Sequence, residues 1–172
     1  MNLAPTTSTT ATLALGDALA VVTLKHRGFK AEDFARVHPA GSLGRKLMQV
    51  KEVMHKGDEL PMVESSASLR EAIVKMSVGR LGITGIAMQG ELVGCLSDGD
   101  LRRILESGEV DLERSVETAM HADPRRIPED SLASEAIRLM EETKITVLFV
   151  ENIEGKVIGA VHMHDLLQAG VA

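Results

Sequence analysis

Two stretches of the chain, Ser68–Met76 (SLREAIVKM) and Leu132–Met140 (LASEAIRLM), carry one pattern twice. In both, the triplet Glu-Ala-Ile is followed three residues later by methionine, and the second copy lies 64 residues after the first. Apolar residues recur at helical spacing in both stretches, which predicts a pair of amphipathic helices. The two helices are the first sign that the chain contains one structural unit in duplicate.

The repetition extends over most of the sequence from about residue 50 onward. Further matching pairs keep the same order, and their spacing drifts slowly along the chain. They are Met76/Met140 at an offset of 64, Gly94/Gly159 and Asp100/Asp165 at 65, and Met54-His55/Met120-His121 at 66. Self-similarity at a steady period indicates duplicated supersecondary units.

Each copy predicts the same order of elements: a short strand, an amphipathic helix, two strands and a closing helix. Turns are expected at Gly90 and at Glu154-Gly155. One copy alone is too small to build a good core, so we expect the halves to pack on each other as an α/β (α+β) fold with pseudo-two-fold symmetry. The expected ranges are 61–63, 69–78, 84–88, 91–97 and 99–105 in the first copy, and 125–127, 132–143, 146–150, 156–162 and 164–169 in the second.

The segment before the repeats has a different character. Residues 8–27 predict a helix that a Ser/Thr cluster caps and Gly28 ends, and residues 31–37 predict a second, short helix. The long helix is apolar on most sides, which is typical of a helix buried inside a larger body. A few short helices cannot bury so much apolar surface, so we expect this segment to be one piece of a larger domain.

Composition excludes several classes of protein. The chain of 172 residues is 44% hydrophobic and 26% charged, with a net charge of -6, which argues against a binder of nucleic-acid polymers. The single cysteine, Cys95, allows no intrachain disulfide and favours a reducing compartment. The first residues carry no basic leader, and we expect no apolar run to approach the ~20 residues of a membrane span. We therefore expect a cytoplasmic protein without a membrane partner.

The duplicated unit resembles a tandem pair of CBS domains. The resemblance covers residues about 50–172 and is carried by the same three elements in each copy. They are Val53-Met54, LREAIVKM and GCLSDGDL in repeat one, and Ala119-Met120, ASEAIRLM and GAVHMHDL in repeat two. The resemblance implies a regulatory module that binds a ligand.

The first part resembles the end of a sugar isomerase (SIS) domain, in LAPTTSTTATLALGDALAV and HPAGSLGRKL. The whole chain is similar to the C-terminal part of D-arabinose 5-phosphate isomerases. These enzymes convert ribulose 5-phosphate into arabinose 5-phosphate, the precursor of the Kdo sugar of lipopolysaccharide. The implied domains are 1–48, the end of an SIS domain, 49–112, CBS repeat one, and 113–172, CBS repeat two. The family's phosphate loop, catalytic lysine and glutamates should lie upstream, so we expect no isomerase activity from this chain alone.

Ser97 and Asp100 are the leading candidates for ligand binding. They stand where a strand is predicted to end and a helix to begin, so a hydroxyl, helix N–H groups and a carboxylate are presented together. Such N–H groups suit a phosphate, and a carboxylate suits ribose hydroxyls. The resemblance implies a nucleotide at this position. The alternative is that Ser97 and its neighbours only cap the helix.

His162 and Asp165 hold the equivalent places in repeat two. His162 replaces the serine or threonine usual in nucleotide-binding repeats, and the run His162–Asp165 has too few ligands for a zinc site, so we expect no metal. Thr84 and Arg102 are lesser candidates near the same cleft. Cys95 is interpreted as a small core residue.

His38 is a candidate of a different kind. A histidine that titrates near neutrality can open a sugar ring or move a proton between neighbouring carbons. The resemblance implies that His38 matches the family's active-site histidine, acting on a sugar phosphate without a redox or other cofactor. The alternative is a histidine that simply precedes the Pro39 turn.

The sequence therefore predicts a regulatory CBS pair that binds a nucleotide or a nucleotide-sugar such as CMP-Kdo, in a homodimer or homotetramer. Two alternatives stay open. One is a ligand-free CBS oligomerisation module. The other is the regulatory part of a related SIS-type sugar phosphate isomerase.

Overall fold

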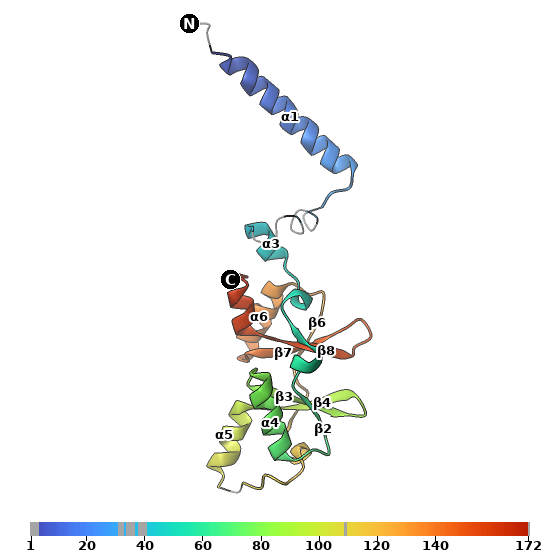
Figure 1. The fold of residues 1–172 in the computed structure, drawn as a ribbon, viewed down its shortest axis with the longest axis vertical. Helices are drawn as coiled ribbons and strands as arrows, with labels where there is room; N and C mark the ends of the chain where they lie inside the picture. Colours follow the sequence, from blue (N-terminus) through green and yellow to red (C-terminus); the bar gives the residue numbers. More distant parts are fainter. Residues whose placement is uncertain (1–3, 31–32, 34–36, 38–40, 109, 172) are drawn as a thin grey trace. The chain divides into compact units, whose positions relative to one another are not determined.

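The computed structural model describes residues 4–30, 33, 37, 41–108 and 110–171. The chain divides into two compact units, Met1–Gly44 and Arg45–Ala172, which are treated separately. Figure 1 draws the chain as a ribbon and labels many of its helices and strands.

The first unit contains the helix α1 (Thr6–His26), whose C-terminal end is set by Gly28 at φ 65° as expected. The expectation that the Ser/Thr cluster caps its start was wrong. The residue before the helix is Pro5, and the hydroxyls of Thr9 and Thr10 donate back to carbonyls of the first turn. The helix predicted over 31–37 falls largely outside the described residues.

None of the side chains of α1 is buried, and the helix has 21 residues with an 18-residue window of mean hydropathy 1.3, which meets the length and composition of a membrane span. This differs from the expectation that no apolar run approaches that length. A core helix or a signal sequence meets the same criteria, so α1 by itself does not establish a membrane segment.

The second unit consists of two four-stranded sheets with helices packed on each, which confirms the predicted α/β (α+β) fold. The strand orders are β2-β3-β4-β5 and β1-β8-β7-β6. The strands are β1 (His55–Lys56), β2 (Met62–Glu64), β3 (Ile83–Met88), β4 (Glu91–Ser97), β5 (His121–Ala122), β6 (Arg126–Pro128), β7 (Val147–Glu151) and β8 (Val157–His162). The helices are α3 (Ser42–Leu47), α4 (Leu69–Gly79), α5 (Asp98–Glu106), α6 (Ala133–Thr143) and α7 (Met163–Gln168), with 3-10 turns at Val50–Glu52, Gly57–Glu59 and Val116–Thr118.

Each sheet includes a strand from the segment that leads into the other repeat. β1 leads into repeat one but pairs antiparallel with β8 of repeat two, where His55 lies opposite Ala160. β5 leads into repeat two but pairs antiparallel with β4 of repeat one, where His121 lies opposite Cys95. The repeats therefore exchange their first strands, and neither sheet is complete without the other repeat.

These lead segments, residues 48–56 and 112–122, also complete the hydrophobic core of the opposite repeat. Val50 is fully buried in the core of repeat two. Its N–H donates to the Ser131 carbonyl at 2.9 Å, and the Met48 carbonyl accepts from the Ala133 N–H at 2.8 Å. Val116 is fully buried in the same way in the core of repeat one. The exchange thus buries apolar side chains as well as pairing backbone groups.

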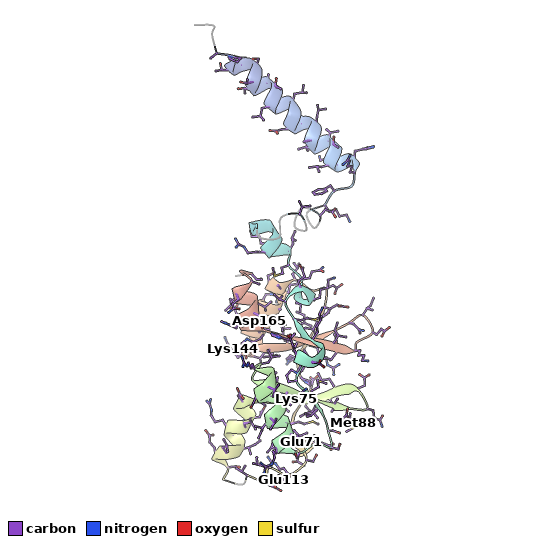
Figure 2. The ribbon with its side chains drawn as sticks, viewed as in Figure 1. Glu71, Lys75, Met88, Glu113, Lys144 and Asp165 are labelled. Atoms are coloured by element: carbon purple, nitrogen blue, oxygen red, sulfur yellow. The ribbon has the colours of Figure 1, made fainter. Side chains whose placement is uncertain are left out.

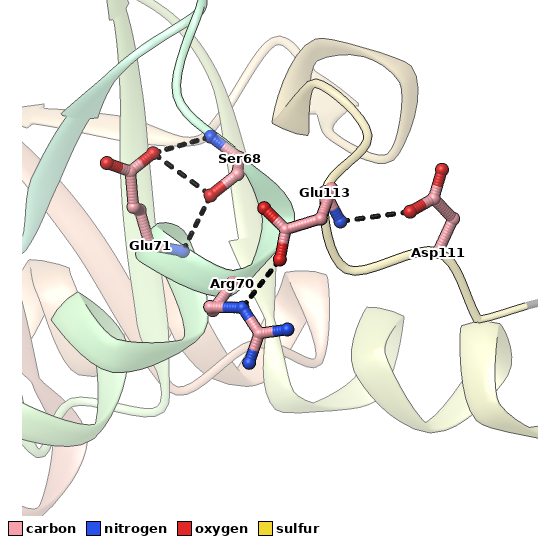
Figure 3. A network of polar contacts seen from close by, with 5 residues as sticks. All are labelled: Ser68, Arg70, Glu71, Asp111 and Glu113. Carbon is pink, nitrogen blue, oxygen red and sulfur yellow. Dashed lines mark hydrogen bonds and ion pairs between the residues drawn. The ribbon is translucent and has the colours of Figure 1, made fainter.

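Polar contacts hold the second lead segment at the start of α4, as Figure 3 shows. Ser68 caps the helix, because its hydroxyl accepts from the Glu71 N–H and the Glu71 carboxylate accepts from the Ser68 N–H. Arg70, in the same turn, forms an ion pair with Glu113 at 2.8 Å. The Glu113 N–H donates to Asp111 at 3.0 Å, which shapes the approach of the lead segment to the helix.

Successive residues of the central strands alternate between two apolar layers, as strand geometry requires. In β7, Leu148 and Val150 join the helix-covered core of repeat two, whereas Val147 and Phe149 join a core between the two sheets. Burial on both faces explains why these strands read as continuous apolar runs. The buried members of the core between the sheets are Leu81, Leu92, Cys95, Val147, Phe149 and Ala160.

Two glycines permit the close approach of the lead segments. A β-carbon at Gly159 would lie 2.7 Å from the His55 carbonyl oxygen and 2.8 Å from the Met54 sulfur. A β-carbon at Gly94 would lie 3.1 Å from the His121 carbonyl oxygen and would collide with the Met120 sulfur. The repeated Met-His pairs and the repeated glycines are therefore the two sides of one contact, made twice.

The predicted elements of the repeats are confirmed, with ends that differ by at most a few residues. The turn at Gly90 has positive φ at Gln89 and Gly90, which is typical of a two-residue type I′ hairpin. The matching turn at Gly155 lies in a longer loop, residues 152–156, and the step in repeat offset from 64 to 65 falls within this hairpin. The strands β1 and β5 were not predicted, because two-residue strands carry no alternation pattern.

We predict that Gly159→Ala lowers the free energy of unfolding by about 1–3 kcal/mol, because the new methyl group displaces the His55 backbone. Gly99→Ala is the matched control. Its nearest neighbour would be 3.6 Å away, and alanine favours the first turn of α5, so stability should rise by up to about 1 kcal/mol. Urea unfolding followed by circular dichroism measures both changes. A Gly159→Ala chain as stable as wild type would show that the lead segment does not depend on this contact.

Candidate functional site

A cleft of about 1000 Å³ lies between the two repeats of the second unit. Repeat one contributes the start of β3, the end of β4 and the first turn of α5. Repeat two contributes the segment after β5, the end of α6 and the start of β7. Figure 2 labels Lys144, which follows α6 and lines the cleft, and Asp165 on α7, which does not line it.

Ser97 and Asp100 both line this cleft, at junction one, where β4 meets α5. Ser97 caps α5: its hydroxyl accepts from the Asp100 N–H at 3.2 Å, and its N–H donates to Asp100 Oδ2 at 2.8 Å. The hydroxyl proton is directed to the same carboxylate oxygen at 2.5 Å. Ser97 therefore caps the helix, and its role in ligand binding stays a prediction.

The carboxylate of Asp100 is ionised and held by neighbours. Burial opposes its ionisation, but hydrogen bonds from Ser97 and the guanidinium of Arg103 outweigh burial, so its pKa lies below the ordinary value. The Asp100 side chain is only 15% exposed, whereas that of Arg103 is 71% exposed. Arg103 therefore covers the carboxylate from the solvent side and can turn toward a ligand in the cleft.

The floor of the cleft is apolar and comes from both sheets. Cys95, Val147 and Phe149 belong to the core between the sheets and also line the cleft. Burial, with a smaller contribution from the Asp100 charge, raises the pKa of the Cys95 thiol to about 11. The thiol is therefore protonated at neutral pH, in agreement with its interpretation as a small core residue. An apolar floor beside charged walls suits a flat ring that carries a polar tail.

Two basic residues enter the cleft from equivalent, strained positions. Arg80 ends α4 and Lys144 ends α6, 64 residues apart, and both line the cleft. Each has left-handed backbone geometry, with φ of 55° and 59°. Glycine is the usual residue at such a helix end, because a β-carbon there costs roughly 1–2 kcal/mol. Basic side chains retained twice at an unfavourable backbone position point to a role in the cleft.

Junction two, where β8 meets α7, has different contacts. His162 Nδ1 accepts from the His164 N–H at 3.0 Å, and His162 lines the cleft. Burial lowers the pKa of His162 below its ordinary value, and the neighbouring His164 and His55 act in the same direction against the charge of Asp165. Asp165 Oδ2 lies 2.9 Å from His55 Nε2, on the lead segment of repeat one. The ligand role predicted for this pair stays a prediction.

The structure does not bring the remaining candidates into the cleft lining. Thr84 is fully buried, and its hydroxyl donates to the Ala72 carbonyl at 3.1 Å, toward α4. Arg102 is exposed and is replaced in the lining by its neighbour Arg103. His38 lies outside the described residues. Within the described ranges, no group of three or more His, Cys, Asp or Glu side chains could hold a metal ion.

The lining includes Arg80, His121 and Lys144, none of which was predicted as a site residue. For Arg80 and Lys144 a sequence signal exists, because each is a basic residue that directly follows a repeated helix. His121 stands out in the sequence only as the repeat equivalent of His55, and its place in the cleft follows from the pairing of β5 with β4. Strand exchange between repeats leaves no local sequence signal, so this position needed the structure.

Comparisons with known proteins agree with this architecture. The family model described as CBS domain matches residues 50–107 and 114–172. The chain is 48% identical over 174 residues to the arabinose 5-phosphate isomerase KdsD of Escherichia coli O6:H1 and 46% identical to that of Pseudomonas aeruginosa. The alignments cover 99% of this chain but 52% and 53% of those proteins, so the chain spans about half the length of the curated relatives it matches.

Among solved structures, the crystal structure of CBSX2 in complex with AMP is similar to the chain with a TM-score of 0.62 and 25% sequence identity. The similarity covers 72% of this chain and 96% of that one. That protein therefore shares the two-sheet architecture on which the cleft is built.

We predict that Arg80→Gly and Lys144→Gly each raise the free energy of unfolding by about 1 kcal/mol, because glycine relieves the left-handed strain. Arg138→Gly, in the middle of α6 on an exposed face, is the control and should lower stability by about 1 kcal/mol. Urea unfolding of the three variants measures the differences. Loss of stability in all three would contradict the assignment of strain at the helix ends.

Proposed function

The chain belongs to the CBS domain family, and from that premise we propose that its cleft is a regulatory site for a nucleotide or a nucleotide-sugar. The observation that carries the proposal is the cleft at junction one, where a carboxylate, a helix start and an apolar floor meet basic side chains from both repeats. The structure of CBSX2 with AMP supports an adenosine nucleotide as one ligand of this architecture.

Each part of a nucleotide has a matching group in the cleft. The base stacks on the floor beside Phe149, and the ribose hydroxyls approach Asp100, whose carboxylate is ionised. The phosphate is held by Arg80 and Lys144, which approach from opposite repeats. Release of Arg103 from Asp100 supplies a third cation as the ribose takes its place on the carboxylate.

CMP-Kdo is the nucleotide-sugar that we favour. The cleft volume of about 1000 Å³ lies at the upper end for small-molecule sites, so it accommodates a ligand larger than AMP. A CMP-sugar acid carries a phosphate and a carboxylate, which matches basic residues in both repeats. The relatives are arabinose 5-phosphate isomerases, and the resemblance places their product upstream of Kdo, so CMP-Kdo would act as a feedback ligand.

The proposed context is a cytoplasmic arabinose 5-phosphate isomerase that acts on a sugar phosphate without a cofactor. The segment 1–48 is proposed to be the end of its SIS domain, with 49–112 and 113–172 as the two CBS repeats. The helix α1, apolar on most sides, agrees with a place inside a larger domain. The catalytic role that the resemblance implies for His38 stays a prediction.

A second candidate function is a purely structural oligomerisation module. The observation in its favour is a pair of exposed valines on α4, Val74 and Val78, one helical turn apart. An apolar stripe of this kind can pair with a second copy in a homodimer or homotetramer. This function needs the helix surface and not the cleft.

Calorimetric titration with AMP, ATP, CMP and CMP-Kdo separates the two functions. We expect saturable binding of at least one of them, weakened at least tenfold by Asp100→Ala and by Arg80→Gly. The mass measured by light scattering should not change in either variant. If all four nucleotides fail to bind the wild-type chain, the sensor function is excluded and the oligomerisation function is favoured.

A further inference from the structure

The two junctions hold equivalent places in the two repeats, but their carboxylates have different partners. An offset of 65 relates Ser97 to His162 and Asp100 to Asp165. In each sheet a histidine of the exchanged lead segment lies on the strand beside the junction, His121 beside β4 and His55 beside β8. The two halves therefore present the same groups, and differences between them arise from side-chain contacts.

At junction one, the carboxylate is neutralised from its own helix. Arg103 contacts Asp100 Oδ1, and the Ser97 N–H and hydroxyl contact Oδ2. The ring of His121 has no hydrogen-bond or ion-pair partner among the described residues, and it lines the cleft. The space between Asp100 and His121 is thus open to a ligand in the cleft.

At junction two, the carboxylate is contacted by a side chain of the other repeat. Asp165 Oδ2 lies 2.9 Å from His55 Nε2, and His55 Nδ1 lies 3.3 Å from Glu59 Oε2. Both Asp165 and His55 are 29% exposed, so the contact is partly shielded from solvent. The imidazole occupies the place on the carboxylate that a ribose would need.

Junction two also lacks the groups that would hold a phosphate. The repeat offset places Gln168 where repeat one has Arg103, and Gln168 contacts the ring of His164 at 2.8 Å. The His164 N–H, at the start of α7, is taken by His162 Nδ1. An anionic ligand would therefore find no free helix amide at that position and no arginine on the helix.

We propose that His55 closes junction two, so that the CBS pair binds one nucleotide, at junction one, and not two. The inference rests on the proposed function of the cleft and specifies its stoichiometry. The His55–Asp165 contact then has a second role, because it links the lead segment of repeat one to α7 of repeat two.

A double-mutant cycle tests the closed junction without any ligand. His55→Ala, Asp165→Asn and the double variant are compared by urea unfolding, and we expect a coupling of about fivefold in the unfolding equilibrium constant. The matched cycle of His121→Ala with Asp100→Asn should be additive within about twofold, because those two described side chains form no hydrogen bond or ion pair with each other. An additive His55–Asp165 cycle overturns the inference.

Calorimetry with the nucleotide that binds most tightly tests the stoichiometry. We expect one nucleotide per wild-type chain, a Kd within about threefold of wild type for Asp165→Asn, and a Kd at least tenfold higher for Asp100→Asn. Two nucleotides per chain, or equal weakening by the two substitutions, overturns the inference and leaves the proposed function intact. If no nucleotide binds, the proposed function fails, and the double-mutant cycle alone decides whether junction two is closed.

Discussion

The contact of His55 with Gly159, and its equivalent between His121 and Gly94, is the constraint on which the rest of the structure depends. Each contact lets the backbone of one lead segment lie directly against a strand of the other repeat, where any side chain larger than hydrogen would intrude. The exchange that follows completes both sheets and places Val50 and Val116 in the opposite cores. A single repeat would lack a strand and part of its core, so the two repeats form one folding unit.

The cleft and its asymmetry are consequences of that exchange. Because β5 lies beside β4, His121 is brought to the edge of the cleft near Asp100, and because β1 lies beside β8, His55 is brought to Asp165. Duplication thus supplies two equivalent junctions. Two differences then separate them. Repeat two has histidine in place of Ser97 and glutamine in place of Arg103, which leaves it without an anion cradle, and His55 contacts its carboxylate.

Much of this architecture could be predicted from the repeat. The matched helices, hairpins and strand-to-helix junctions carry strong local patterns, so their order and their duplication were readable, as was the place of Ser97 and Asp100 at a helix start. The exchange of β1 and β5 was not readable, because two-residue strands have no period and pair across more than 100 residues in one case. For the same reason the contacts of His55 and His121 could not be told apart, although both follow methionine at equivalent positions.

Hydrogen exchange of the chain with and without its tightest-binding nucleotide tests the central claim most directly, that one ligand is held between both repeats at junction one. The account predicts slower amide exchange in residues 80–83 and 97–100 of repeat one and in 121–125 and 144–147 of repeat two. Residues 55–59 and 163–168, around the closed junction, should exchange at unchanged rates. Protection confined to one repeat, or protection of equal size around His55 and Asp165, would contradict the account.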